Sequence, residues 1–306
     1  MEPKKIKVMK FGGSCLADAD GFSRVVEIIS DDSDCIIVMS ALKGVTSSII
    51  GYMSQSPGKI DMSGLSDFLF KRHMEIAELA LKGVFLNNYR RDLKSSLERM
   101  EKLELIMSGN AEKPERISAF LQSFGERLSV DLTVAALRQA GKSAVGYQAD
   151  DLGVITEGDY LNGIVSIEKT ALNIRDTLIK DVMYGKIPVI TGYIGRNTKG
   201  ETTLLGRDGS DYTASVVASC VGSMNLTLWK DVDGIMTGDP KDQVACRVLR
   251  NLSYDQAEKI SLGGAKIVHP LAVSQARKEM VSIRVRSVYD PFSDGTLIED
   301  DGFRQP

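Results

Sequence analysis

Short apolar runs alternate with longer amphipathic stretches along most of the chain, and this alternation predicts an α/β fold. The apolar runs are nearly continuous, which is typical of strands buried on both faces of a sheet. They predict strands at Ile6–Met9, Cys35–Met39, Ser143–Tyr147, Ile187–Thr191, Asn225–Trp229 and Val281–Val288. Helical periodicity fills segments between them, such as DGFSRVVEIIS, RLSVDLTVAALRQA and SDYTASVVASCVGS. We therefore expect a largely parallel sheet with helices on both faces.

One region departs from this rhythm. From about Ser63 to Leu128 the sequence shows helical periodicity and no convincing strand, which predicts a helical excursion from the sheet with a bend near SGNAEKPE. No internal repeat or Pro/Ser-rich linker divides the chain. We therefore expect a single compact domain of two lobes over residues 1–306.

Composition and charge narrow the class of protein. The chain has 306 residues, 43% of them hydrophobic, and a net charge of −3, which argues against a nucleic-acid partner. Four scattered cysteines without a C-x-x-C pair, and only two histidines, argue against a structural zinc site. The N-terminal MEPKKIKVMK lacks the apolar core of a signal peptide, and no apolar run is long enough to cross a membrane. We expect a cytoplasmic protein with reduced thiols.

The first candidate site is IKVMKFGGSC, where the first predicted strand ends in glycine. It fits neither the P-loop nor the dinucleotide-binding pattern. Gly12 and Gly13 would let backbone N–H groups approach an anion, and Lys10 would add a positive charge at the carboxyl end of a buried strand, where α/β sheets bind ligands. A tight turn beside a solvated lysine explains this segment equally well.

A second glycine-containing segment, AGKS at Ala140–Ser143, does not suit a phosphate. A P-loop requires a glycine five residues before Gly141, and Ala136 stands there. We interpret Gly141 as the left-handed cap that ends the preceding helix.

The segment TTLLGRDGSDYTASVVAS contains Arg207 and Asp208 between two glycines, just before a predicted helix. Ser210 or Asp211 is a natural N-cap, so capping alone is one interpretation. The other is anion binding, because a helix N-terminus attracts negative charge and Arg207 can hold a carboxylate through two parallel hydrogen bonds.

Two later segments carry further charges. LWKDVDGIMTGDPK places Lys230, Asp231, Asp239 and Lys241 in a turn-rich loop after a strand, which suits a nucleotide rim or an ordinary strand exit. LGGAKIVHP places Lys266 after two glycines, before a proline that begins the next predicted helix.

Taken in order, these segments resemble the aspartokinase branch of the amino acid kinase superfamily. KFGGSC resembles the K-F-G-G-T-S signature, VMSALKGVT the second-strand segment, SFGERLS the S-x-G-E segment and GRDGSDYTA the G-R-G-G-S-D-Y-T segment. WKDVDGIMTGDP resembles the nucleotide loop and GAKIVHP the late lysine segment. The resemblance runs from about Ile6 to Ile298.

The resemblance implies a three-layer αβα sandwich around a mainly parallel eight-stranded sheet. The N-terminal lobe, residues 1 to about 200, would hold L-aspartate, and the C-terminal lobe, about 201–306, would hold ATP. The implied reaction transfers the γ-phosphoryl of Mg²⁺-ATP to the side-chain carboxylate of L-aspartate, giving 4-phospho-L-aspartate, the first step toward lysine, threonine and methionine.

The resemblance also implies residue roles. Arg207 would hold the substrate α-carboxylate and Glu126 its ammonium, while Asp211 would position Lys10 and the substrate. The remaining roles are lining of the aspartate pocket by Ser40, Thr46 and Ser210, and contacts to ATP by Lys10, Gly12, Gly13, Ser14, Lys230, Asp231, Asp239, Lys241 and Lys266. Mg²⁺ would be held through phosphate oxygens, with no protein ligand of its own.

Some positions depart from the family pattern and leave the substrate preference open. Ser14-Cys15 replaces Thr-Ser, Phe124 stands where histidine is common, Asp208 where glycine is common and Lys241 where arginine is frequent. Asp208 adds a negative charge beside Arg207, which would weaken its hold on a carboxylate.

Most aspartokinases continue into paired ACT domains, whereas this sequence has no such segment. We therefore expect no intrinsic inhibition by lysine or threonine, a homodimer, and regulation, if any, through a separate ACT-domain subunit. Whether the chain is a truncated form stays open.

Two alternative functions follow from the same residues. A kinase of this fold can use another acceptor, such as N-acetylglutamate, carbamate or a nucleoside monophosphate, but a carboxylate at Glu126 favours a free ammonium. A non-catalytic sensor of nucleotide and amino acid is the other alternative, but it would have little need of Lys10 between two anions.

Overall fold

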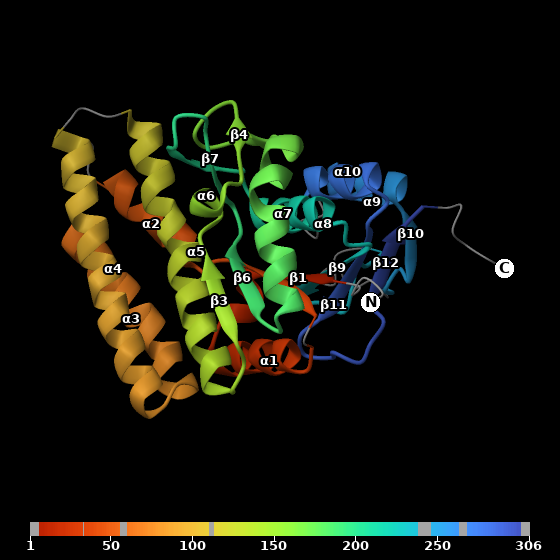
Figure 1. Cartoon of the computed structure of the whole chain (residues 1–306), viewed down its shortest axis with the longest axis horizontal. Coiled ribbons are helices and arrows are strands. Elements are labelled where there is room, and N and C mark those ends of the chain that lie inside the picture. Colours follow the sequence, from red (N-terminus) through yellow and green to blue (C-terminus); the bar gives the residue numbers. More distant parts are fainter. Residues whose placement is uncertain are drawn as a thin grey trace.

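An eight-stranded sheet forms the centre of the computed structural model, which describes residues 6–32, 34–55, 60–109, 113–237, 246–262 and 268–300 (Figure 1). The strands, in spatial order, are β10 (Asn251–Ser253), β12 (Thr296–Glu299), β11 (Ser282–Ser287), β9 (Asn225–Lys230), β1 (Lys7–Phe11), β2 (Cys35–Met39), β6 (Ile187–Thr191) and β3 (Ala144–Tyr147). Every neighbouring pair is parallel except β11 and β12. The expectation of a mainly parallel eight-stranded sheet is confirmed.

All six strands predicted from the sequence are present. β2 and β6 have the predicted bounds, and the other four begin or end one or two residues away. The unpredicted strands are short: β10 and β12 in the sheet, and two small antiparallel pairs, β4 (Thr156–Glu157) with β5 (Ile164–Val165), and β7 (Ile194–Arg196) with β8 (Thr202–Leu204). Two to four residues are too few to show a hydrophobic period.

Helices cover both faces of the sheet, giving three layers (Figure 1). One face is covered by α1 (Ala19–Ser30), α2 (Val45–Gln55) and α5 (Pro114–Gln139), with α3 (Met62–Ala80) and α4 (Gly83–Gly109) outside α5. The other face is covered by α7 (Ile167–Met183), α8 (Gly209–Val221), α9 (Tyr254–Leu262) and α10 (Pro270–Lys278). Within the described ranges, no helix has the length and apolar character that a membrane span requires.

The helical excursion is formed by α3, α4 and the first part of α5, seen at the left of Figure 1. α5 ends where the sequence predicts, because Gly141 has a φ of 76° and the Lys142 amide donates to the Leu137 carbonyl. A left-handed glycine after the last turn is a common way to end a helix.

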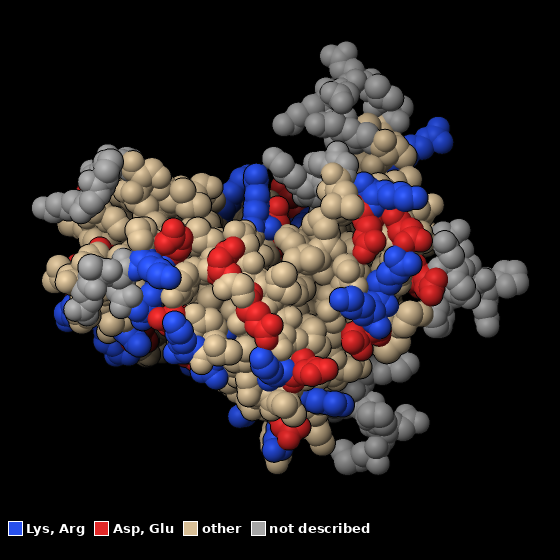
Figure 2. All heavy atoms as spheres, turned by 90° about the horizontal axis from the view of Figure 1, so that it is seen from above, with Lys and Arg blue, Asp and Glu red and all other residues tan. Residues whose placement is uncertain are grey.

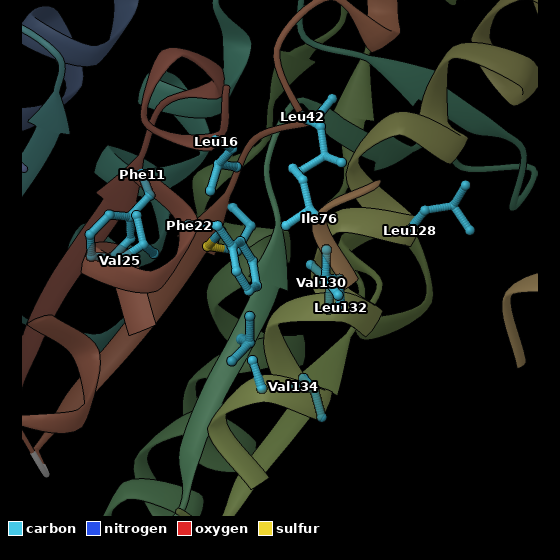
Figure 3. Close-up of a cluster of buried hydrophobic side chains, with 14 of the residues drawn as sticks. Phe11, Leu16, Phe22, Val25, Leu42, Ile76, Leu128, Val130, Leu132 and Val134 are labelled. Atoms are coloured by element: carbon cyan, nitrogen blue, oxygen red, sulfur yellow. The ribbon is translucent and has the colours of Figure 1, made fainter. Parts of the chain in front are cut away.

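The sheet separates two hydrophobic cores. Successive residues of a strand point to opposite faces, so in β2 Ile37 contributes to one core and Ile36 to the other. Figure 3 shows part of the first core, to which Phe22 of α1 and Leu132 of α5 both contribute. Burial on both faces explains why β2 reads as a continuous apolar run.

Candidate active site

The candidate site lies where four parallel strands end at one edge of the sheet. β1 leads into Gly12, β2 into Ser40, β6 into Tyr193 and β9 into Asp231. β1 pairs with β2 on one side and with β9 on the other, so the chain connections diverge beside it. Ligands of open α/β sheets bind at such a switch point.

A cavity of about 860 Å³ opens at this edge. In Figure 2, Lys and Arg side chains are grouped at the edge of a hollow in the upper outline of the molecule. The cavity wall includes eleven of the residues predicted from the sequence, namely Lys10, Gly12, Gly13, Ser14, Ser40, Thr46, Glu126, Arg207, Ser210, Lys230 and Asp231. Residues about 220 positions apart in the chain are therefore brought into one site.

Three charges, the buried Lys10 and Asp211 and the partly exposed Lys230, form a chain at the cavity. Lys10 Nζ lies 2.7 Å from Asp211 Oδ1, and Lys230 Nζ lies 2.9 Å from Asp211 Oδ2. Their side chains are 6% (Lys10), 1% (Asp211) and 15% (Lys230) exposed. Burial opposes the charge of Asp211, but the two lysines hold its pKa well below the usual range. Two ammonium groups share one carboxylate, which leaves positive charge for an anionic ligand.

The pKa of Lys10 depends on the same three charges and on burial. Burial lowers the pKa of Lys10, the Asp211 carboxylate opposes this, and the Lys230 ammonium lowers the pKa further. An anion in the cavity beside Lys10 would therefore relieve the repulsion between the two lysines.

The glycine loop corrects one expectation. The Gly12 amide donates to the Trp229 carbonyl at 3.2 Å, so it is already used inside the protein and is not the anion donor we predicted. A short turn begins at Gly13, which packs so tightly against the next loop that a Cβ atom on it would lie 2.8 Å from the Ala41 carbonyl oxygen. Ser14 Oγ donates to Asp231 Oδ1 at 2.8 Å, which joins this loop to the segment after β9.

Glu126 is the buried acid of the cavity wall. It comes from the middle of α5, is 4% exposed, and accepts a hydrogen bond from the Ala41 amide at Oε1 (3.2 Å). Its Oε2 atom is buried without a hydrogen-bond partner among the described residues. Burial raises the pKa of Glu126 to about 8, although the Ala41 amide and Lys10 act in the opposite direction. Such a carboxyl group gains most from a cationic ligand.

The segment before α8 carries Arg207, which is exposed at the cavity wall. Gly206 and Asp208 on either side of it both have left-handed backbones, with φ of 76° and 59°. Glycine adopts this conformation without strain, which explains physically why glycine suits position 208. Ser210, in the first turn of α8, packs so closely on Gly192 that a Cβ on that glycine would lie 2.5 Å from Ser210 Cβ.

The remaining predicted wall residues sit on the loop between β2 and α2. The Ser40 amide donates to the Phe11 carbonyl at 3.2 Å, which fixes the end of β2 against the end of β1. Thr46, in the first turn of α2, faces α5, where its Oγ1 lies 3.6 Å from a Cβ built on Gly125. Gly125 therefore allows α2 and α5 to close around the Glu126 carboxylate.

Two departures from the family pattern lie away from the cavity wall. Phe124 packs edge-on against Phe120 with ring centres 5.3 Å apart, inside the first core. Cys15 is buried, and its thiol donates to the Trp229 carbonyl at 3.3 Å. Burial raises the pKa of Cys15 to about 11, so it stays a thiol. Both substitutions concern packing, whereas Asp208 lines the cavity itself.

The structure adds wall residues that the sequence did not indicate. Tyr193 lies directly beyond β6 with a φ of 68°, and its hydroxyl donates to Gln122 Oε1 at 2.9 Å. Its place after a buried strand was a usable signal, because the carboxyl ends of parallel strands meet. Asn162 lies in an irregular segment, and only tertiary structure brings it to the cavity.

Three predicted site residues, Asp239, Lys241 and Lys266, lie outside the described residues. Their roles stay predictions.

Comparison with known proteins agrees with this geometry. The sequence model of the amino acid kinase family matches residues 5–287, and the chain belongs to this family. Aspartokinase 1, chloroplastic, of Arabidopsis thaliana is 33% identical over 95% of this chain, and aspartokinase 3, chloroplastic, of the same plant is 31% identical over 97%. The chain spans 51% and 53% of the lengths of these relatives, about half.

Solved structures show the same fold. The crystal structure of E. coli aspartokinase III in complex with aspartate and ADP matches with a TM-score of 0.86 and 28% identity, over 96% of this chain and 64% of that chain. UMP kinase from Bacillus anthracis matches with a TM-score of 0.51 and 17% identity, over 98% of each chain. The second likeness concerns the fold alone.

Proposed function

We propose that this protein is an aspartate kinase, which transfers the γ-phosphoryl group of ATP to the side-chain carboxylate of L-aspartate. One observation carries the proposal: a single cavity combines the half-paired Glu126 carboxylate with the ammonium groups of buried Lys10 and partly exposed Lys230. The first suits a substrate with a free amino group, and the second suits phosphates. The likeness to aspartokinases over nearly the whole chain supports the same conclusion.

Recognition of the acceptor rests on the two charged groups of its α-carbon. The substrate ammonium binds at Glu126 Oε2. This pairing favours the charged form of the carboxyl group, which burial disfavours. Arg207, exposed at the cavity wall, takes the α-carboxylate. Ser40, Thr46 and Ser210 complete the pocket. An N-acylated amino acid or a nucleotide acceptor lacks the ammonium group and would leave Glu126 unpaired.

Transfer needs positive potential more than a base. The aspartate side chain is already an anion at neutral pH, so its oxygen attacks the γ-phosphorus directly, and the bond to the β–γ bridging oxygen breaks to release ADP. Lys10 lies at the strand end between the two anions and stabilises the charge of the transferring group. Asp211 positions Lys10 through their 2.7 Å contact.

The nucleotide side follows from the loops after β1 and β9. Lys230 contacts phosphate, and Gly13 and Ser14 face it from the turn after β1. The oxygen-rich edge formed by Ser14 and Asp231 suits Mg²⁺ carried by the phosphate oxygens of ATP. Asp239, Lys241 and Lys266 remain predicted nucleotide contacts, and the homodimer and a separate ACT-domain subunit remain predictions.

The proposal is tested by ATP-dependent product formation with L-aspartate, with hydroxylamine trapping the acyl phosphate as a hydroxamate. We expect abundant hydroxamate with L-aspartate and little with L-glutamate or N-acetylglutamate. Lys10→Ala should abolish turnover while the protein still binds ATP. Nucleotide binding without hydroxamate from any acceptor would reject the kinase in favour of a sensor, and turnover in Lys10→Ala would reject the role of Lys10.

A further inference from the structure

A nearly buried arginine lies directly beside Glu126 on α5. Arg127 has a side chain 16% exposed, and all three of its guanidinium nitrogens have partners. Nε donates to Ser123 Oγ at 2.9 Å, Nη1 to Gln148 Oε1 at 3.4 Å, and Nη2 to Asp150 Oδ2. None of these groups lines the cavity, so Arg127 acts on the site only through the elements that it joins.

Apart from Ser123 on α5 itself, the partners of Arg127 lie in or next to two other elements. Asp150 lies in α6 (Ala149–Leu152), just after β3, and its Oδ2 also accepts a hydrogen bond from Thr202 Oγ1 at 2.7 Å. Thr202 is the first residue of β8. A second, longer contact of 3.5 Å runs directly from Arg127 Nη2 to Thr202 Oγ1. One guanidinium therefore fixes β8 against α5, and the two elements pack side by side.

Backbone hydrogen bonds fix the segment that connects β8 to the cavity wall. The Leu204 amide donates to the Tyr160 carbonyl, Leu205 to Tyr193 and Gly206 to Leu161, at 2.7 to 3.0 Å. Arg207 follows immediately. The chain from Thr202 to Gly206 thus has little freedom, and the place where β8 docks on α5 sets the place from which Arg207 extends.

We propose that Arg127 is a positioning residue, which holds Glu126 and Arg207 at the separation that matches the ammonium and α-carboxylate of one amino acid. The inference rests on the proposed function, in which those two groups bind the ammonium and the α-carboxylate that share the α-carbon of aspartate. Glu126 is the preceding residue on α5, and Arg207 follows Thr202 along the chain through β8. The positions of both side chains therefore depend on one planar guanidinium. The forked geometry of arginine suits this role, because it bonds several partners in fixed directions.

Other contacts hold α5 against the hairpin formed by β7 and β8. The positioning role can therefore be tested by removing one contact without unfolding the protein. Arg116 Nε lies 3.4 Å from Glu201 Oε1, and Tyr193 donates to Gln122, so the hairpin stays docked when one hydroxyl is removed. Thr202→Val deletes the hydroxyl with little change in shape, and Thr202→Ser restores it. Thr203→Val is the matched control, because Thr203 is next along β8 and its hydroxyl pairs with Thr156 Oγ1 at 2.6 Å, away from Arg127.

The experiment measures the Kd for L-aspartate by titration calorimetry and the KM for ATP by the hydroxamate assay. We expect Thr202→Val to raise the aspartate Kd by about tenfold with the ATP KM unchanged, as the loss of one buried hydrogen-bond partner implies. Thr202→Ser should restore the wild-type Kd. Thr203→Val should lower the melting temperature without changing the Kd.

The outcomes separate the inference from the proposed function. An unchanged aspartate Kd in Thr202→Val, or an equal rise in Thr203→Val, overturns the positioning role. Wild-type protein that binds L-aspartate but forms no hydroxamate overturns the transfer reaction alone, since the Kd values still report on Arg127. Wild-type protein that does not bind L-aspartate overturns both.

Discussion

At the scale of single residues, the properties of the site depend on how each buried charge is paired. Asp211 keeps its carboxylate because two lysines lie within 3 Å of it, at 2.7 and 2.9 Å. Glu126 has one backbone donor, and its other oxygen has no partner among the residues that the structure describes. The same kind of side chain is therefore held charged at one place and neutral at another. The half-paired acid is the one that a ligand can complete.

This difference predicts how aspartate binding depends on pH. In the free protein the pKa of Glu126 is about 8, so below pH 8 it must lose a proton before it can pair with an ammonium group. We expect the affinity for L-aspartate to fall as the pH decreases from 8 to 6, by up to about tenfold per pH unit. Titration calorimetry across this range measures the slope.

Glu126→Gln is the control for this slope, because glutamine has no proton to lose and nearly the same shape. It should bind aspartate weakly and with little pH dependence between pH 6 and 8. A slope that persists in Glu126→Gln would assign the titration to another group.

At the scale of elements, the turn after β1 is shaped by how closely loops approach one another. A Cβ atom on Gly12 would meet its nearest neighbour, the Trp229 carbonyl oxygen, at 3.5 Å, which is ordinary contact. A Cβ on Gly13 would lie 2.8 Å from the Ala41 carbonyl oxygen, and a backbone atom cannot rotate away. The two adjacent glycines are thus required to different degrees.

We expect Gly13→Ala to lower the free energy of unfolding by about 1–3 kcal/mol through overpacking. It should also reduce turnover, because the turn must move away from the loop that follows β2. Gly12→Ala, whose φ of −73° suits alanine, should change stability by less than about 1 kcal/mol. Urea unfolding compares the two, and equal losses would show that the Ala41 contact is not what requires glycine.

At the scale of the whole molecule, one sheet separates two cores that come from different parts of the chain. Helices α1–α5 pack on one core and α7–α10 on the other, yet strands β1, β2, β6 and β9 contribute to both. We propose that the two cores form a single cooperative unit, because neither core can form without the strands that it shares with the other.

The single tryptophan provides the test. Trp229 belongs to the first core, while Leu178 of α7 is fully buried in the second. Leu178→Ala should lower the free energy of unfolding by about 2–5 kcal/mol. It should shift the unfolding curves measured by tryptophan fluorescence and by far-ultraviolet circular dichroism to the same midpoint. Leu128→Ala, in the first core, is the matched variant. If Leu178→Ala leaves the fluorescence curve unchanged, the two cores unfold separately.

Much of the fold could be read from the sequence because its central strands are buried on both faces. Such strands appear as unbroken apolar runs, as in CIIVM and IPVIT, whose bounds match β2 and β6. The short strands β7 and β8 could not be found this way, because their pairing is set by the partners they meet. Hydrophobic periodicity therefore could not predict the hairpin of β7 and β8, which contains Thr202, a partner of Arg127.

The sequence by itself determined the chemistry available at the site. Lysines, glycines, an arginine and acids stand at strand and helix ends, where side chains and backbone groups are left without regular partners. Only the tertiary structure decided how they are used. It commits the Gly12 amide to Trp229, pairs Asp211 with two lysines, and leaves one oxygen of Glu126 unpaired within the described part of the chain. These outcomes depend on distances between residues far apart in the chain and on exclusion of water, and neither quantity is local to a sequence.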